Sequence, residues 1–521
     1  MSAFWAVVFG QRTLREEVET MAKDKLYSME SGENNFADGG GSIDLKKPLL
    51  SEGSSKPKHS HDRRHFLRSR KDVVLPNPAH AICSTLIVAL GPLSLGFALG
   101  FTSPTQAAII RDLNLTIAQF STFGSILSVG CMLGAIVSGR LADYFGRKPA
   151  LSVAVIPVLA GWSLIVLCKA ATPLIIARTL VGFGGGIISF TVPMYIGEIS
   201  PKHLRGTLGT MNQLAITIGV TLSYIVGMYF HWRTLALLGG IPGVLLVVGL
   251  LFIPESPRWL AKADRKEELQ VCLQWLRGKE FNVSDEIQDI QAATEASNAL
   301  PSVKWSDLKQ RKLIQTLIVG VGLMVLQQFS GINAVMLYSS FIFTTAGVQN
   351  PGVATVALGI LQVVMTLAAA GLIDKAGRRL LLMVSAGGMA LSSFLVGFSF
   401  YLRALQPEMS LELATFIGYL ALVSLLVYIA AFSLGVGAIP WIIMSEIFPA
   451  HVKGTAGSVA TLVNWFCSSA VTLIFNSMLL WSSTGSFWIF AAECVGTMVF
   501  VALYVPETRG RTLEQIEASF K

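Results

Sequence analysis

Apolar runs of roughly 20 residues recur from about residue 81 onward, and they limit the possible folds more than any other feature of the chain. We count twelve of them. Each is long enough to cross the hydrocarbon core of a bilayer, which is about 30 Å thick. Backbone groups in hydrocarbon must bond within their own segment, so each run is predicted to be a helix. With 52% hydrophobic and only 14% charged residues among 521, the sequence predicts an all-α membrane protein with twelve transmembrane helices.

Three short passages of the first half return in the second half in the same order. The pairs are residues 143–148 with 374–379, 197–201 with 445–449, and 254–258 with 506–510. One repeated passage could be chance, but three in one order indicate a duplicated half. The halves of such a membrane protein are related by a pseudo-two-fold axis, and the seam between them can open to either side in turn. The duplication therefore predicts two pseudo-symmetric six-helix bundles and favours a transporter.

The positive charge of the chain is distributed as in a membrane protein rather than a nucleic-acid-binding protein. The formal net charge is +8. Lysine and arginine gather before the first span, between spans two and three, in the long central loop, and between spans eight and nine. The loops at the other ends of the spans contain fewer of them. This asymmetry predicts that both termini are cytosolic.

The same pattern divides the chain into five parts. We expect a disordered cytosolic tail over 1–79, a first bundle over 80–253, a small cytosolic helical linker domain over 254–312, a second bundle over 313–505, and a short cytosolic tail over 506–521. Leu49-Leu50 in the first tail resembles a di-leucine sorting signal read by adaptors of internal membranes. The usual acidic residue is one position too far away, at Asp44, so an incidental leucine pair is the alternative.

The cysteines predict neither a disulfide framework nor a metal site. Of the 6 cysteines, five lie in or beside spans, where a thiol behaves as a small apolar group. Cys272 lies in the predicted cytosolic loop, where disulfides are rare. No pair has the spacing of metal ligands, and the sequence gives no reason to expect a cofactor.

Five amide side chains lie within three of the predicted spans. They are Gln213 in span five, Gln327, Gln328 and Asn333 in span seven, and Asn464 in span eleven. Amides both donate and accept hydrogen bonds, as the hydroxyls of a sugar do, without the heavy desolvation cost of a charge. They therefore suit a neutral polyhydroxylated ligand. The alternative is that they bond one helix to another.

Two of the predicted spans contain residues that allow a helix to bend. Gly331 follows the glutamine pair in span seven, and broken helices of this kind line the sites of transporters. In span ten, Trp441 follows Pro440 and the glycines Gly435 and Gly437. A flat indole can lie against the C–H face of a pyranose while its N–H donates to a hydroxyl. The alternative is a packing or interfacial tryptophan.

Charged residues at the predicted cytosolic ends of the spans are duplicated as well. In the first half they are Asp143, Arg147, Glu198 and Arg205, and their counterparts are Asp374, Arg378, Glu446 and Lys453. Carboxylate–guanidinium pairs there would tie helices together in one conformation and part in the other. The alternative is charge that only sets the topology.

The motifs together resemble the sugar-porter branch of the major facilitator superfamily. They occupy residues 139–148, 193–198, 254–258, 327–333 and 506–510, and the resemblance covers about residues 80–515. Details at 103–108 and 331–333 are similar to plant transporters of the early-responsive-to-dehydration-like group. The resemblance implies the major facilitator fold, a monosaccharide substrate of the glucose or fructose type, and sugar contacts from Gln213, Gln327, Gln328 and Asn333.

The chain departs from the family pattern at three positions. Gln362 stands where related glucose carriers have asparagine in span eight, and Ser433 stands where many have glutamate in span ten. Leu337 replaces the first of two tyrosines in span seven, which leaves Tyr338 as the gate candidate. These changes keep the sugar class and leave the preferred sugar open.

The pattern favours facilitated diffusion over proton coupling. Proton-coupled sugar porters carry an aspartate in span one near an arginine in span four; the arginine matches Arg178, but Thr102 stands at the aspartate position. Threonine does not titrate near neutral pH. Glu493 within span twelve is an intramembrane carboxylate, so a proton-coupled symporter or antiporter is the alternative.

Other classes of function fit less well. A non-transporting sugar sensor would need a signalling extension, and the predicted tail is short. The sequence has no HExxH motif, nucleophile elbow or in-span histidine pair, so an enzyme is not expected. The di-leucine pair and the resemblance favour the vacuolar membrane over the plasma membrane, and we expect a monomer.

Overall fold

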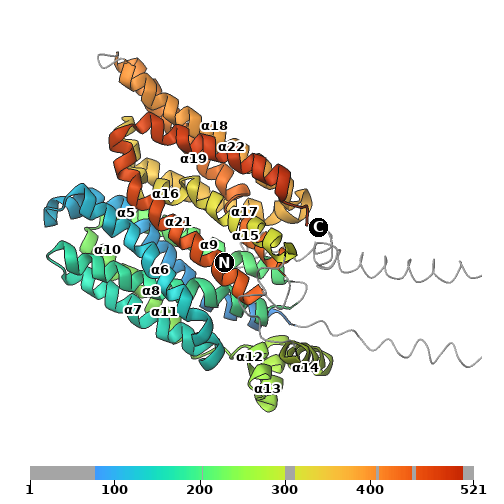
Figure 1. The fold of residues 1–521 in the computed structure, drawn as a ribbon. Coiled ribbons are helices and arrows are strands. Elements are labelled where there is room, and N and C mark those ends of the chain that lie inside the picture. The colour runs from blue at the N-terminus through green and yellow to red at the C-terminus, as the bar shows by residue number, and fades with distance from the viewer. Residues whose placement is uncertain (1–76, 202–203, 300–310, 406–409, 449–452, 509–521) are drawn as a thin grey trace, which may run out of the picture. The chain divides into compact units, whose positions relative to one another are not determined.

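The computed structural model describes residues 77–508 except 202–203, 300–310, 406–409 and 449–452 (Figure 1). It describes only the backbone of 296–299, 311–313, 374, 445 and 453–455. The described residues lie in the compact unit from Val74 to Lys521. The Leu49-Leu50 pair, almost all of the predicted 1–79 tail and most of the 506–521 tail lie outside the described residues.

The described residues form helices, and twelve helical segments are long and apolar enough to cross a membrane, as predicted. The six spans of the first half are α4 (Ala79–Val88) with α5 (Leu90–Leu113), α6 (Ile117–Phe145), α7 (Arg147–Leu167), α8 (Ala171–Ile199), α9 (Arg205–Tyr229), and α10 (Trp232–Gly239) with α11 (Ile241–Leu250). Those of the second half are α15 (Arg311–Phe329) with α16 (Ile332–Ala346), α17 (Pro351–Ala376), α18 (Arg378–Leu405), α19 (Leu411–Leu434) with α20 (Ile439–Ile447), α21 (Lys453–Trp481) and α22 (Ser483–Tyr504).

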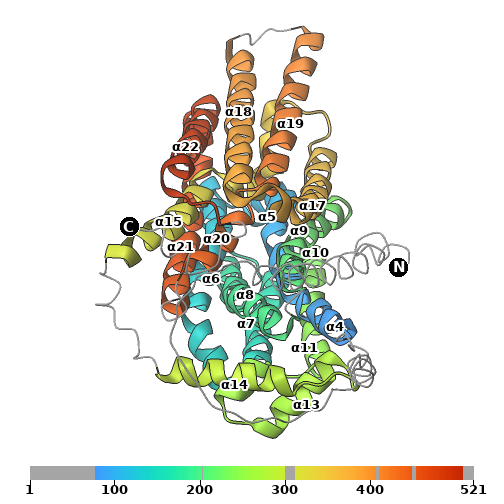
Figure 2. The ribbon, with the colours of Figure 1, turned by 90° about the vertical axis from the view of Figure 1, so that its right-hand side faces the viewer.

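Three short helices lie between the halves in the chain: α12 (Pro257–Lys262), α13 (Lys266–Arg277) and α14 (Ser284–Ala299). They fall in the stretch predicted to be helical. Figure 2 shows α13 and α14 lying across the ends of first-half helices. The Arg277 guanidinium donates to the backbone oxygen of Ile199 at 2.9 Å, and the Tyr195 hydroxyl donates to that of Pro254 at 2.7 Å. We call the side of the bundle that carries α12–α14 the linker face.

Close packing within the first half depends on small residues. Helix α6 lies against α8, and a Cβ added at Gly134 or Gly182 would overlap a backbone oxygen of the other helix. Added Cβ atoms at Gly184 and Gly186 would likewise overlap the backbone oxygens of Ala154 and Cys131, so this glycine-rich stretch of α8 allows close helix contact. The first-half bundle is therefore dense where these helices cross.

The two halves meet along three pairs of helices, each with one member from each half. Helix α6 packs on α21, α9 on α17, and α5 on α16 (Figure 1). The seam is thus lined by spans one, two and five of the first half and by spans seven, eight and eleven of the second. The spans that carry the predicted amides are among them.

Candidate functional site

Spans seven and ten are both broken, as predicted from their glycine and proline residues. Span seven is interrupted at Gly331, whose φ of +89° is in the left-handed region and whose added Cβ would lie 2.5 Å from the ring of Phe490. Span ten is interrupted between Leu434 and Ile439. The Tyr428 hydroxyl of span ten donates to the backbone oxygen of Ser330 at 2.8 Å, which joins the two breaks.

Gln327 fills the interruption of span ten with hydrogen bonds. Its side-chain nitrogen donates to the backbone oxygens of Val436 at 2.7 Å and Gly437 at 3.0 Å. Its side-chain oxygen accepts from Asn464 of α21 at 3.0 Å. Both amides are at most 3% exposed. Broken spans leave backbone carbonyls without helical partners, and this pair satisfies two of them.

A second amide pair reaches the seam between the halves. The Asn333 nitrogen donates to the Gln328 oxygen at 2.6 Å and to the Ser468 hydroxyl at 2.8 Å. That hydroxyl lies 3.1 Å from the Ser128 hydroxyl of α6 in the first half. The two serines were not predicted as site residues, because a serine in a span has no sequence signal that separates it from ordinary packing.

The remaining predicted binding residues are near the same helices but outside this network. Gln362 of α17 is buried, and its oxygen has no hydrogen-bond partner among the described residues. Gln213 of α9 and Trp441 of α20 are half-buried. Tyr338 of α16 is buried against Phe475, with ring centroids 5.7 Å apart, and its hydroxyl has no partner in the described part of the chain.

Hydrogen bonds between the halves gather at the span ends away from the linker face. The Ser103 and Ser339 hydroxyls are 2.9 Å apart, and the backbone N–H of Ser340 donates to Ser103 at 3.0 Å. Asn476 donates to the Ser121 hydroxyl at 2.8 Å, and the Tyr224 hydroxyl donates to the Met336 backbone oxygen at 2.6 Å. Polar contacts thus tie the halves together on that side of the amide network.

On the linker face, Arg147 forms the centre of a charged cluster in the first half. Its guanidinium donates twice to the Glu198 carboxylate, with both distances 2.9 Å. It also lies 3.5 Å from Asp143, which in turn accepts from Lys262 of α12 at 3.1 Å. Only 7% of the Arg147 side chain is exposed. The bidentate pair fixes the start of α7 against the end of α8.

The second half repeats this arrangement with looser geometry. Arg378 lies 3.4 Å from Glu446. Each of these pairs joins helices of one half, so neither is an ion pair between halves. Arg205 lies at the start of α9 and makes no ion pair in the described part of the chain. The side chains of Asp374 and Lys453 lie outside the described residues.

Two further carboxylates of the repeated motifs, Glu255 and Glu507, lie beside these charged pairs, and neither was predicted as a site residue. Glu255 accepts from the backbone N–H groups of Arg147 at 3.0 Å and Lys148 at 3.1 Å. Burial raises the pKa of Glu255, although these hydrogen bonds favour its charged form. Glu507 accepts from the corresponding backbone groups of the second half. Both glutamates follow a proline in a passage that is repeated between the halves, and this repeat could have identified them from the sequence.

The residues considered for proton transfer lie in different halves of the chain. Arg178 of α8 is fully buried and donates to the backbone oxygen of Ala98 at 2.6 Å and to the Thr102 hydroxyl at 2.7 Å. Its guanidinium carbon lies 5.0 Å from the centroid of the Phe123 ring. Glu493 lies on α22 of the other half, where one oxygen accepts from Thr497 at 3.0 Å. No ion pair joins it to Arg178.

A family model described as "Sugar (and other) transporter" matches residues 84–520. Among curated proteins, the chain is 46% identical over 478 residues to "Sugar transporter ERD6-like 6" of Arabidopsis thaliana, covering 92% of this chain and 98% of that one. It is 47% identical over 436 residues to "Sugar transporter ERD6-like 8" of the same plant, covering 84% and 92%.

Solved structures agree with these relatives. The proton:xylose symporter XylE bound to 6-bromo-6-deoxy-D-glucose superimposes with a TM-score of 0.71 at 27% identity, covering 85% of this chain and 100% of that one. An inward-open structure of XylE gives the same TM-score at 26% identity. The matched length, the identities and the shared architecture show that this chain belongs to the sugar transporter family of the major facilitator superfamily.

Proposed function

We propose that the protein carries monosaccharides of the hexose type across its membrane by alternating access. The observation that supports this most is the buried amide network at the breaks of spans seven and ten, which continues through Ser468 to the seam between the halves. A neutral ligand at this place would find donors and acceptors without a charge to desolvate. The proposed binding residues are Gln213, Gln327, Gln328, Asn333, Gln362, Trp441 and Asn464.

The breaks in the two spans explain how such a site could respond to its ligand. Gln327 bonds backbone oxygens of span ten, and Asn464 bonds Gln327, so a sugar hydroxyl that replaced either partner would change contacts among three helices. The half-buried Trp441 lies in the short helix after the same break. Ligand binding would thereby be coupled to the position of the α20 end of span ten.

Alternating access needs contacts that close each side in turn. The bonds around Ser103 and Ser121 support closure on the side away from the linker face, with Tyr338 as a gate residue. On the linker face we propose that the charged clusters around Arg147 and Arg378 hold the span ends of each half as rigid units. With the linker face cytosolic, as the basic loops predict, both termini would be cytosolic. We place the protein in the vacuolar membrane as a monomer.

Facilitated diffusion is the mechanism we favour. Arg178 bonds Thr102 and a backbone oxygen rather than a titratable carboxylate in span one. Symport or antiport with protons is the second candidate, because Glu493 is a largely buried carboxylate within span twelve. The similar protein XylE is named as a proton:xylose symporter, which also supports this second candidate. A sugar sensor remains the third.

Uptake of labelled glucose and fructose into proteoliposomes tests the proposed site. Gln327→Ala leaves Asn464 and two backbone oxygens without their partner, a loss of roughly 1–3 kcal/mol, so we expect uptake at low sugar concentration to fall about tenfold. Gln349→Ala, which removes an amide beyond the end of α16, is the matched control and should transport normally. Equal uptake by both variants would remove the site assignment.

A further inference from the structure

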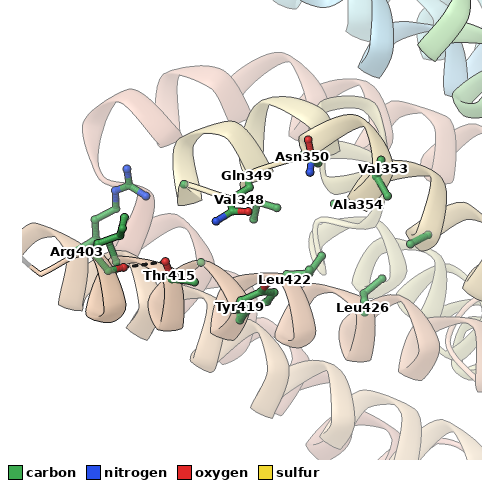
Figure 3. Close-up of a pocket in the computed structure, with 15 residues that line it drawn as sticks. Val348, Gln349, Asn350, Val353, Ala354, Arg403, Thr415, Tyr419, Leu422 and Leu426 are labelled. Atoms are coloured by element: carbon green, nitrogen blue, oxygen red, sulfur yellow. Dashed lines mark hydrogen bonds between the residues drawn. The ribbon is translucent and has the colours of Figure 1, made fainter.

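A groove on the surface of the second half lies apart from the proposed sugar site. It has a volume of about 340 Å³ and is bounded by the turn between α16 and α17, the first turns of α17, the last turn of α18, and α19 from Leu411 to Leu426. Figure 3 shows Arg403 at one end and Leu426 at the other, with Thr415, Tyr419 and Leu422 in order between them along α19. The groove therefore runs along the helix.

The chemistry of the lining changes along this length. The end that contains Arg403 also holds Thr415, and the far end of α19 contributes Leu422 and Leu426. Opposite α19, Gln349 lies between the two ends and Asn350 lies next to Val353. Thr415 and Leu426 are 11 residues apart, which on an α-helix is about 16 Å. That is close to half of a hydrocarbon core about 30 Å thick. The groove is thus about as long as one leaflet is thick, with Arg403 at one end and Leu426 at the other.

Arg403 is held at the polar end by the shape of the backbone below it. It lies in the last turn of α18, and its guanidinium rests over Gly347. Gly347 has a φ of +82°, and an added Cβ would overlap the Arg403 guanidinium. Gly418 of α19 packs against the same turn, where its added Cβ would lie 3.2 Å from the Gly347 oxygen. Because Gly347 and Gly418 have no Cβ, the turn can pack closely on α19 and the Arg403 guanidinium can lie over Gly347.

The charge of Arg403 is available to a ligand. The side chain is exposed, and it forms no ion pair with any acidic side chain that the structure describes. Tyr419, at 59% exposed, lies on α19 one turn after Thr415 and lines the groove. Tyrosine is a residue that membrane proteins favour at the bilayer interface. Arginine binds phosphate through two parallel hydrogen bonds, which a neutral interface residue does not offer.

We propose that this groove binds an anionic phospholipid of the leaflet opposite the linker face. The headgroup phosphate pairs with Arg403, and one acyl chain lies along α19 against Val353, Leu422 and Leu426. The bilayer supplies phospholipid along this surface, and burying an acyl chain in the groove removes apolar surface that the helices otherwise leave open. The lipid would bridge α17, α18 and α19, whose ends meet at the groove.

Native mass spectrometry of the purified full chain tests this proposal. Phosphatidylglycerol and phosphatidylcholine with identical acyl chains are the probes. We expect the wild-type protein to retain phosphatidylglycerol at least fivefold better than phosphatidylcholine. Arg403→Gln should abolish that preference, and Arg403→Lys should restore part of it. Ala414→Trp, which fills the groove without changing charge, should reduce retention of both lipids.

Two control variants separate the groove from the rest of the lipid-facing surface. Arg111→Gln removes an exposed arginine at the same membrane side of the first half, and Phe416→Trp alters an exposed residue of α19 outside the groove lining. Both should retain lipid as the wild type does. Equal retention of the two lipids by the wild type, or unchanged retention in Arg403→Gln and Ala414→Trp, would overturn the proposal. These experiments measure lipid retention and not transport, so their outcome does not depend on the proposed sugar site.

Discussion

Glu507 caps the helix that begins at Arg378: its carboxylate accepts from the backbone N–H groups of Arg378 at 3.0 Å and Arg379 at 3.1 Å. Glu255 does the same for Arg147 and Lys148 in the first half. A carboxylate at a helix N-terminus satisfies free donors and meets the positive end of the helix dipole. The duplicated sequence motifs thus correspond to duplicated contacts.

Removing either cap should destabilise the protein. We expect Glu255→Ala and Glu507→Ala each to lower the free energy of unfolding by about 1–2 kcal/mol, since two backbone donors lose their acceptor. Thermal unfolding in detergent measures this. Glu280→Ala, at an exposed position in the turn after α13, is the control and should melt as the wild type does. A wild-type melting temperature in both cap variants would contradict a stabilising role.

The cap at Glu255 should also make stability depend on pH. Because burial raises its pKa, the folded protein binds a proton at this site more readily than the unfolded chain. The free energy of unfolding should therefore fall as the pH rises from the ordinary glutamate pKa of about 4.3 towards the higher pKa of Glu255 in the folded protein. Glu255→Gln cannot ionise and should escape this loss. Between about pH 4 and pH 7, the melting temperature of the variant should rise relative to that of the wild type. A difference in melting temperature that does not change with pH would contradict the raised pKa of Glu255.

The two charged pairs of the linker face should differ in strength. Arg147 and Glu198 have side chains 7% and 12% exposed and are joined by two bonds of 2.9 Å, whereas Arg378 and Glu446 are 14% and 25% exposed and 3.4 Å apart. Breaking a buried pair strands a charge and costs roughly 3–5 kcal/mol, but a more exposed pair contributes about 1 kcal/mol or less. Glu198→Ala should therefore lower the melting temperature more than Glu446→Ala. The reverse order would show that burial does not control their strength.

The break in span seven gives a test at a single glycine. Gly331→Ala places a Cβ 2.5 Å from Phe490 and forces an L-residue into a φ of +89°. We expect a loss of roughly 1–3 kcal/mol in stability, together with lower sugar uptake because the Gln327 and Gln328 backbone would shift. Gly457→Ala in α21, where an added Cβ meets nothing within 4 Å, is the matched control. If both variants behave alike, the left-handed turn is not required.

The spans and the breaks could be predicted from the sequence because each depends on local properties. Helix length follows from the apolar runs, and the breaks at Gly331 and Gly435 follow from residues that disturb a helix. The partners of each amide could not be predicted, because they depend on how spans far apart in the chain pack. Ser468 joins Asn333 to the first half only because α21 lies against α6, and nothing in its sequence neighbourhood distinguishes it.

Closure of the side opposite the linker face can be tested by cross-linking. The Ser103 and Ser339 hydroxyl oxygens are 2.9 Å apart, so cysteines at these positions should form a disulfide under a mild oxidant. We expect the double variant to lose sugar uptake when oxidised and to regain it when reduced. Each single variant, treated in the same way, controls for the native cysteines. Uptake that persists in the cross-linked protein would show that this contact does not need to open during transport.

The energy source of transport is the most consequential property to measure. With Thr102 rather than a carboxylate beside Arg178, no titratable partner in span one can exchange a proton with the guanidinium. We therefore expect sugar uptake into vesicles to be the same with and without a pH gradient, and Glu493→Gln to transport at the wild-type rate. Thr102→Asp is the informative comparison, because it would place a carboxylate next to the buried Arg178. Accumulation of sugar above equilibrium that collapses with a protonophore, and that is lost in Glu493→Gln, would instead establish proton coupling through span twelve.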